Sequence, residues 1–177
     1  MKLKDILIGL FALSLLGGTG YLWMAPAGLA KAPDITVSTI RGEKISLSEL
    51  SGQPVLVNFW ATTCPGCIKE MPHLVELYKE LAPKGFEMIG IAMSYDPPNQ
   101  VIALADGRKL PYPIALDIQG DAARAFGDVR LTPSSFLIAP DGRVVHQKIG
   151  EMNMSKVHAM ITDMLAQSAT PQSVSQN

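Results

Sequence analysis

The feature that most constrains this chain is its only pair of cysteines, Cys64 and Cys67. They follow an uninterrupted apolar stretch, residues 55–57, continued by an Asn, a Phe and a Trp, which has the length and composition of a buried strand. Pro65 stands between the cysteines, and proline is well suited to the first position of a helix because its missing N–H would have no partner there. The sequence therefore predicts a strand, then Cys64 at a turn, then a helix.

Two thiols at this spacing, at the start of a helix, are typical of a dithiol/disulfide redox centre. The partial positive charge at a helix N-terminus stabilises a thiolate at Cys64. Cys67, one turn further into the helix, is expected to be the more buried, resolving thiol. Such a pair exchanges disulfides through a mixed disulfide and requires no metal or organic cofactor.

Two other roles for the cysteines are less favoured. A structural zinc site needs four ligands, but there is no second CxxC motif, and the histidines are scattered at His73, His146 and His158. A purely structural disulfide that closes so short a loop removes little chain entropy from the unfolded state.

The surroundings of the motif resemble a known family. Residues 45–61, followed by Cys-Pro-Gly-Cys, are similar to the thioredoxin-like proteins of the TlpA/ResA group, which are extracytoplasmic thiol-disulfide oxidoreductases. Pro72 stands where this fold kinks its active-site helix. Residues 132–138 resemble the cis-proline loop and the next strand, and Asp141-Gly142 resembles the hairpin turn that follows. The similarity runs from about residue 33 to about residue 166.

This resemblance implies an α/β, thioredoxin-like fold: a central mixed β-sheet with helices on both faces, and a family insertion between the second βα unit and the cis-Pro loop. It implies that Thr132-Pro133 is a cis peptide, at the one residue type where cis is cheap, and that this loop lies against the dithiol. Pro133 thereby joins Cys64 and Cys67 as an expected catalytic-site residue. Thr132 and Trp60 are the expected substrate-binding residues.

The sequence departs from the family pattern in two ways. Thr63 stands before the first cysteine, where members commonly have Trp, and Asn58 stands where thioredoxins place a buried Asp. The resemblance implies that a glutamate on the strand after the active-site helix serves as the proton acceptor instead, and Glu87 occupies that place. We expect Glu87 to lie beneath the motif, because a carboxylate near a buried thiol can act as a base.

The N-terminus carries a targeting or membrane element. Lys2 and Lys4 precede an uncharged stretch, residues 6–24, and the lysines are expected to stay cytoplasmic while the domain lies outside. An uncleaved anchor is favoured over a cleaved signal, which would give a soluble periplasmic protein. The predicted organisation is a membrane anchor or signal segment with linker at 1–32, a thioredoxin-like domain at 33–167 and a disordered tail at 168–177.

Composition supports one domain and argues against nucleic-acid binding. The 177 residues suffice for a single core, and the net charge of −1 gives no electrostatic attraction to nucleic acid. The chain also lacks a glycine-rich phosphate fingerprint and a long basic run.

The pattern along the chain predicts alternating elements. Strands are expected at 35–40, 55–60, 87–93, 135–138 and 143–149. Helices are expected at 65–81, from 100 to about 105, at 121–126 and in a last segment with apolar residues at helical spacing, namely Val157, Met160, Ile161, Met164 and Leu165.

Taken together, the residues and the resemblance predict an enzyme that exchanges a Cys64/Cys67 dithiol with substrate proteins. A reductant fed by a membrane thiol-electron carrier is favoured, in cytochrome c or copper-oxidase assembly or in general thiol reduction. A disulfide-introducing oxidant is the competing role. A copper metallochaperone using Met93, Met152 and Met154 is less favoured, because its relatives use CxxxC with a distant His. A peroxiredoxin function is the least favoured, because the Thr and Pro that activate a peroxidatic cysteine are not at their required positions relative to Cys64.

Overall fold

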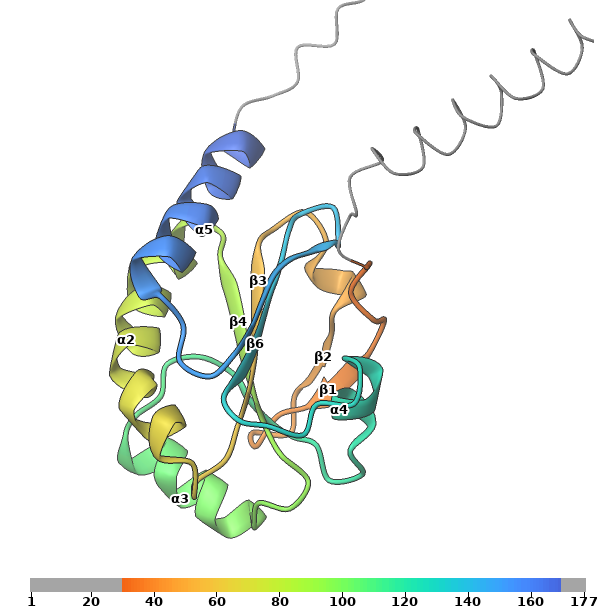
Figure 1. Ribbon diagram of the computed structural model, residues 1–177, viewed down its shortest axis with the longest axis vertical. Helices are drawn as coiled ribbons and strands as arrows, with labels where there is room; N and C mark the ends of the chain where they lie inside the picture. Colours follow the sequence, from red (N-terminus) through yellow and green to blue (C-terminus); the bar gives the residue numbers. More distant parts are fainter. Residues whose placement is uncertain (1–29, 170–177) are drawn as a thin grey trace, which may run out of the picture.

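A central five-stranded sheet organises the chain, whose computed structural model describes residues 30–169 (Figure 1). The strand order is β5-β4-β3-β6-β7, with β3, β4 and β5 parallel and β6 and β7 antiparallel to their neighbours. The strands are β3 (Val55–Trp60), β4 (Glu87–Ala92), β5 (Ile114–Leu116), β6 (Ser134–Ile138) and β7 (Val144–Ile149). The predicted mixed sheet is thus confirmed.

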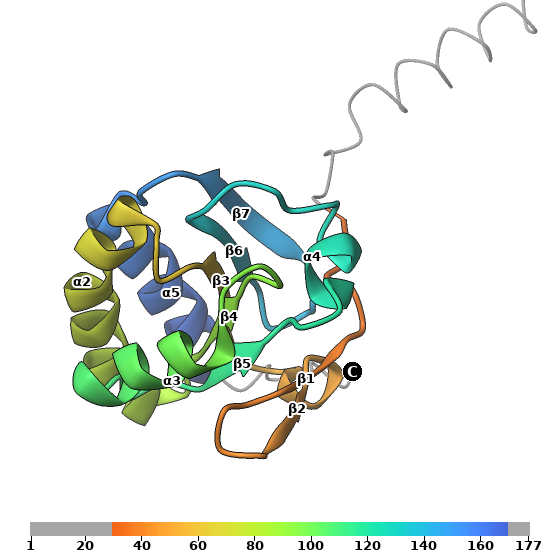
Figure 2. The ribbon, with the colours of Figure 1, turned by 90° about the horizontal axis from the view of Figure 1, so that it is seen from below.

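Helices cover both faces of this sheet (Figure 2). One face carries α2 (Pro65–Leu81), α3 (Pro98–Gly107) and α5 (Met154–Ala169). The other face carries the short helix α4 (Asp121–Ala125) together with a separate hairpin. That hairpin consists of β1 (Thr36–Ser38) and β2 (Lys44–Ser46). The described chain also has two 3-10 turns, η1 (Ser48–Leu50) and η2 (Ala82–Lys84).

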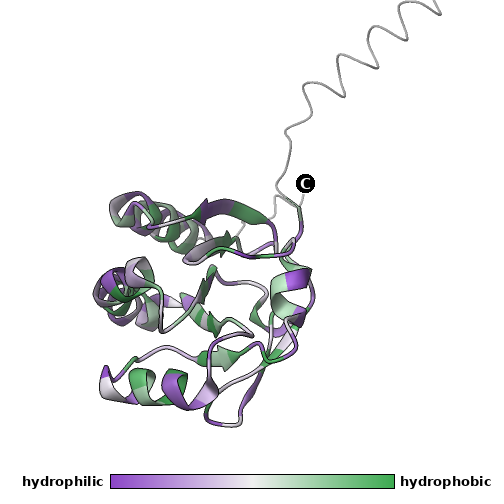
Figure 3. Ribbon diagram, turned by 60° about the horizontal axis from the view of Figure 1, so that its bottom comes forward, coloured by the Kyte–Doolittle hydropathy of each residue, from purple (hydrophilic) through white to green (hydrophobic). Residues whose placement is uncertain are grey.

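The central strand β3 explains why the sequence around residue 57 is almost wholly apolar. Its side chains alternate between two core layers, so that Leu56 and Trp60 pack under α2 while Val57 and Phe59 pack on the α4 side. A strand buried on both faces carries apolar residues at successive positions instead of alternating ones. In Figure 3 the helices show both apolar and polar residues along their length. This is expected of helices that pack one face on a sheet and expose the other to solvent.

The carboxyl ends of β3, β4 and β5 meet at one edge of the sheet, and Cys64 follows β3 at that edge. The described chain starts at the opposite edge, where Ala32 N donates to Gly142 O at 2.8 Å. In Figure 1 the start of the described chain and the end of α5 both lie in the upper part of the domain, while α2 begins at the bottom. The polypeptide thus enters the domain at the end opposite the cysteines.

Several predicted elements differ from the structure. The strand β5 was not predicted, because Pro111 and Pro113 beside it indicate a turn and only its pairing with β4 makes it a strand. Helix α3 is longer than predicted at both ends and starts at Pro98, which fits the first helical position. The first expected strand is shorter and forms its own hairpin with β2.

The described residues include a few contacts just outside the predicted domain, 33–167. Lys31 bridges to Arg143, and α5 continues to Ala169. The predicted domain boundaries stay a prediction. The predicted anchor at 6–24 and the rest of the predicted tail lie outside the described residues. Among residues 30–169, none of the helices combines the length and apolar character that a membrane span requires.

Candidate active site

The two cysteines are joined in a disulfide at the first turn of α2. Cys64 is the N-cap residue, its Cα lies 5.3 Å from that of Cys67, and its Sγ accepts a hydrogen bond from Cys67 N at 3.1 Å. Cys64 is 9% exposed and Cys67 is 2% exposed. Cys64 is thus the less buried of the two cysteines, and its sulfur lies next to a backbone donor, which favours its thiolate once the bond is reduced.

The cis-proline loop packs against this motif. The Thr132-Pro133 peptide is cis, as predicted. A Cβ placed on Gly66 would lie 3.5 Å from Pro133 Cδ, so the proline ring is in contact range of the residues between the cysteines. Thr132, half-buried, brings its backbone to the same place.

Asn58, in the position of the thioredoxin aspartate, forms a buried neutral pair. Its Nδ2 donates to Ser135 Oγ at 2.9 Å across β3 and β6, and both residues are at most 4% exposed. This pair satisfies polar groups inside the sheet, but an amide and a hydroxyl supply no carboxylate for proton transfer at pH 7.

The carboxylate that does lie near the dithiol is Glu70, which the sequence analysis did not single out. It stands three residues after Cys67 on α2, the spacing that puts two side chains on the same face of a helix. It is 3% exposed; Oε1 accepts from Met152 N at 2.6 Å, and Oε2 has no partner within the described chain. Burial raises the pKa of Glu70, nearby Glu151 raises it further, and the Met152 bond opposes them. Such a group keeps its proton to a higher pH than an exposed glutamate does, which suits a carboxylate that exchanges protons with a thiol.

Glu87 lies at the wrong end of the sheet for its predicted role. It begins β4 and pairs with Val55, whereas Cys64 follows Trp60 at the far end of β3. Five residues of strand separate the two levels, about 17 Å at ~3.3 Å per residue. Burial raises the pKa of Glu87 too, but the side chain does not lie beneath the motif, and that prediction is wrong.

Trp60 does not present a surface to a substrate. It is 1% exposed and lies over Gly90, where an added Cβ would be 3.2 Å from the indole Nε1. The predicted substrate contact is therefore not compatible with its burial. The exposed apolar side chains near the cis-Pro loop are instead Leu131 (62%) and Ile149 (54%). Ser134 connects them, because its hydroxyl donates to Leu131 O at 2.7 Å and β6 pairs it with Ile149.

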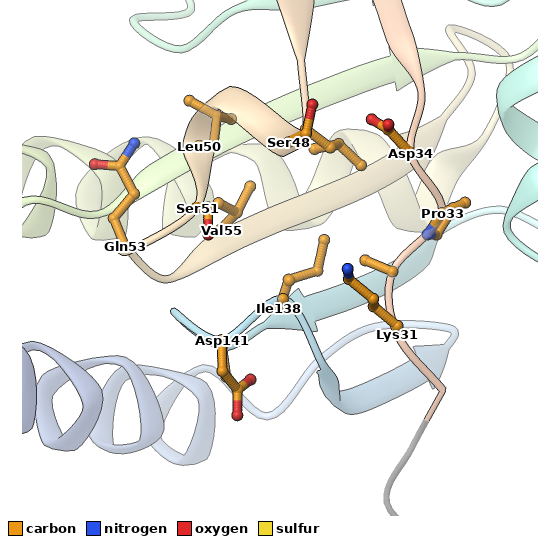
Figure 4. A pocket seen from close by; sticks show the side chains of 14 residues that line it. Lys31, Pro33, Asp34, Ser48, Leu50, Ser51, Gln53, Val55, Ile138 and Asp141 are labelled. Carbon is orange, nitrogen blue, oxygen red and sulfur yellow. The ribbon is translucent and has the colours of Figure 1, made fainter.

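Other cavities and clusters of the described chain lie away from the cysteines. A cavity of about 280 Å³ at the opposite edge of the sheet has Leu50, Val55 and Ile138 among its walls and Lys31 at its rim (Figure 4). Within residues 30–169 no three His, Cys, Asp or Glu side chains gather in a metal-binding arrangement.

Three features together define a thioredoxin-like thiol-disulfide oxidoreductase centre. A helix begins at one cysteine, a second and more deeply buried cysteine lies one turn on, and a cis-proline packs against the residue between them. Comparison with known proteins gives the family. Residues 29–147 match the AhpC/TSA family, and the chain belongs to it.

Similar proteins are named as thiol-disulfide oxidoreductases or as thioredoxin-like proteins. The chain is 36% identical over 130 residues to thiol-disulfide oxidoreductase ResA of Bacillus thuringiensis subsp. konkukian (strain 97-27), covering 72% of each chain. It is 32% identical over 164 residues to thioredoxin-like protein YneN of Bacillus subtilis (strain 168), covering 88% of this chain and 95% of that protein. A crystal structure of a thioredoxin-family thiol:disulfide interchange protein from Chlorobium tepidum TLS matches with a TM-score of 0.72 at 29% identity, over 80% of this chain and 99% of that chain. The chain is thus a ResA-like thiol-disulfide oxidoreductase.

Proposed function

We propose that this protein reduces disulfides in extracytoplasmic polypeptides while tethered to the membrane by residues 6–24. The observation that carries the proposal is the Cys64–Cys67 pair at the N-terminus of α2, with Pro133 packed beside it. The lysines before the apolar stretch support an orientation with the domain outside the cytoplasm.

The reaction begins from the dithiol. The Cys64 thiolate attacks one sulfur of a target disulfide, forming a mixed disulfide and releasing the other target sulfur as a thiolate that takes a proton. Glu70, one turn beyond Cys67, accepts the proton of the second thiol. Cys67 then attacks Cys64 Sγ, which closes the protein disulfide and releases the second target thiol. Two electrons pass to the target, and a donor dithiol restores the starting state.

Exposed apolar side chains support a polypeptide as the substrate. Leu131 and Ile149 border the cis-Pro loop and are more than half exposed. Large apolar side chains exposed beside a reactive group are typical of a protein contact surface. We expect a segment of the target chain to lie over them while its cysteine reaches Cys64.

The physiological task that we propose is reduction during the assembly of cytochrome c or copper oxidases, with a membrane thiol carrier as the electron donor. The names of the ResA relatives support thiol-disulfide exchange, and the apolar N-terminal stretch supports a place at the membrane. A disulfide-introducing oxidant is the competing role for the same site.

Thiol trapping in whole cells distinguishes these two roles. Cells are quenched in acid, free thiols are alkylated with a mass label, and the fraction of dithiol protein is read from a gel. We expect the reduced form to dominate, and the disulfide to accumulate when the membrane thiol carrier is deleted. The matched control is the Cys64→Ser variant, in which a single thiol remains and no internal disulfide can form. Fully oxidised protein with the donor present would reject the reductant role.

A further inference from the structure

A second buried carboxylate, Asp96, is hydrogen-bonded to the turn that leads to the dithiol. It is 3% exposed and follows β4 in the loop before α3. Its Oδ2 accepts from Thr62 N at 2.6 Å, and its Oδ1 accepts from the Thr62 hydroxyl at 2.5 Å. Because both oxygens accept hydrogen bonds, the group is used as a carboxylate.

Thr62 stands inside the turn whose last residue is the attacking cysteine. Cys64 N donates to Ala61 O at 3.2 Å, which closes this turn over Thr62 and Thr63. At ~3.8 Å between successive Cα atoms, the Asp96 carboxylate lies within about 10 Å of Cys64. One side chain thereby holds the turn through two bonds and places negative charge beside the dithiol.

We propose that Asp96 is a positioning residue for Cys64, which fixes the turn before the thiol and supplies a negative charge that keeps the Cys64/Cys67 pair reducing. This inference rests on the proposed dithiol function and deepens it. A negative charge nearby disfavours the Cys64 thiolate, and so disfavours the reduced protein relative to the disulfide. The pair therefore gives up its electrons more readily.

The two parts of this role have opposite effects on the thiol. Asp96→Asn keeps the shape and removes the charge, because the amide oxygen can accept from Thr62 N and the amide N–H can donate to the Thr62 hydroxyl. Thr62→Val keeps the charge and removes the hydroxyl, which donates to Asp96 Oδ1 and lies 3.4 Å from Gln100 Oε1, so the turn at the helix N-terminus loosens. If Asp96 served the fold alone, the Asp96→Asn and Thr62→Val variants would not shift the Cys64 alkylation profile in opposite directions.

The experiment measures two quantities on the full chain and its variants. The first is the rate of Cys64 alkylation by iodoacetamide across pH, in the reduced protein. The second is the equilibrium of the dithiol with oxidised glutathione, in which one protein disulfide and two glutathione thiols form from one protein dithiol and one glutathione disulfide. The other charged groups next to the motif, Glu70 and the Lys69–Glu151 pair at 2.9 Å, are unchanged in every variant.

For Asp96→Asn we expect the alkylation profile to move to lower pH, with a rate about fivefold higher below the thiol pKa, as a unit charge at this distance predicts. The glutathione equilibrium should move about fivefold toward the dithiol, or about 20 mV toward a more oxidising pair. For Thr62→Val we expect a shift of alkylation to higher pH and a rate about twofold lower.

Asp117→Asn is the matched control. Asp117 is also a buried carboxylate, 6% exposed, and accepts from Ala122 N at 3.0 Å and Ala123 N at 2.9 Å at the start of α4. Loss of the Asp117 charge should lower the stability of the fold and leave the pH profile of Cys64 alkylation unchanged. If Asp96→Asn is too unstable to measure in buffer alone, all variants and the wild type are measured in sucrose, which favours the folded state of each.

Two results would overturn the proposal: an unchanged glutathione equilibrium in folded Asp96→Asn, or shifts of the same sign in Asp96→Asn and Thr62→Val. These differ from failure of the proposed function, because in that case the wild-type dithiol itself would not exchange with glutathione.

Discussion

The two edges of the central sheet each hold a glutamate whose pKa is raised by burial, yet they differ in what surrounds it. Glu70 lies at the edge where β3 ends, on the helix that begins at Cys64, and one of its oxygens has no partner among the described residues. Glu87 lies at the edge where β3 begins, half-buried beside Tyr78. The pKa values of both are raised, but only Glu70 shares a helix face with a cysteine.

This difference shows that a raised carboxyl pKa indicates burial alone. Whether the carboxyl takes part in catalysis depends on whether a reactive group lies next to it. At the dithiol edge the buried polar groups Glu70 and Asp96 are each connected to a loop beside Cys64 or Cys67. At the other edge the strands end in turns around a cavity of mixed apolar and polar lining that contains no cysteine. A perturbed carboxylate identifies an active site only when a reactive group lies beside it.

The largest expected effect belongs to the cysteines themselves. Cys64→Ser should lose exchange with protein disulfides entirely, because the thiolate at the helix N-terminus, on the less buried of the two cysteines, is the attacking group. Cys67→Ser should still attack, and should accumulate mixed disulfides with partner proteins because the resolving thiol is absent. Non-reducing gels of cells carrying each variant show these adducts. Adducts on Cys64→Ser and none on Cys67→Ser would reverse the assignment.

Removing the charge of Glu70 should have the next largest effect. Glu70→Gln preserves an acceptor for Met152 N but cannot take a proton, so we expect disulfide exchange at neutral pH to slow by about 10- to 100-fold. Stopped-flow measurement of the reaction with a model disulfide, repeated across pH, gives the rate and its profile. A rate within twofold of the wild type across the profile would remove Glu70 from the mechanism.

Stability should depend on pH through the same residue. Since the pKa of Glu70 is higher in the folded protein than its unfolded value of 4.5, folding favours the protonated form. Its contribution is fully present below that value and is lost as pH rises toward the folded pKa. The free energy of unfolding of the wild type should fall relative to Glu70→Gln over this range, by about 1.4 kcal/mol for each unit of pKa elevation. Urea unfolding of both proteins between pH 4 and 8 tests this, and a constant difference would contradict it.

Local signals explain how much of the fold could be predicted. The strand Val55–Trp60 and the helix Pro65–Leu81 were predicted to the residue, because apolar length, a proline at the first helical position and the cysteine pair all coincide there. The three-residue strand Ile114–Leu116 was not predicted, since only its register with Gly90 and the two residues after it makes it a strand. Pairing between distant segments carries no local signature.

The same distinction applies to the site. Cys64, Cys67 and the cis Pro133 follow from motifs of a few residues, whereas the burial of Glu70 depends on a loop 82 positions away in the chain. The spacing of three residues between Cys67 and Glu70 was visible in the sequence. In the sequence, a glutamate at that helical position has the pattern of an ordinary solvated residue, and only the contact with the loop at Met152 buries it.

The smallest expected effect, and the sharpest test of the two edges, is that of Glu87→Gln. Because Glu87 begins β4 about 17 Å from the dithiol level, we expect the rate of disulfide exchange and the thiol titration to match the wild type. Its raised pKa should still give stability the same pH dependence as that of Glu70, falling as pH rises above the unfolded value. Side-by-side stopped-flow and urea measurements on Glu70→Gln and Glu87→Gln separate the two properties. A slowed exchange in Glu87→Gln would show that charge at the far edge reaches the dithiol, and the contrast between the edges would fail.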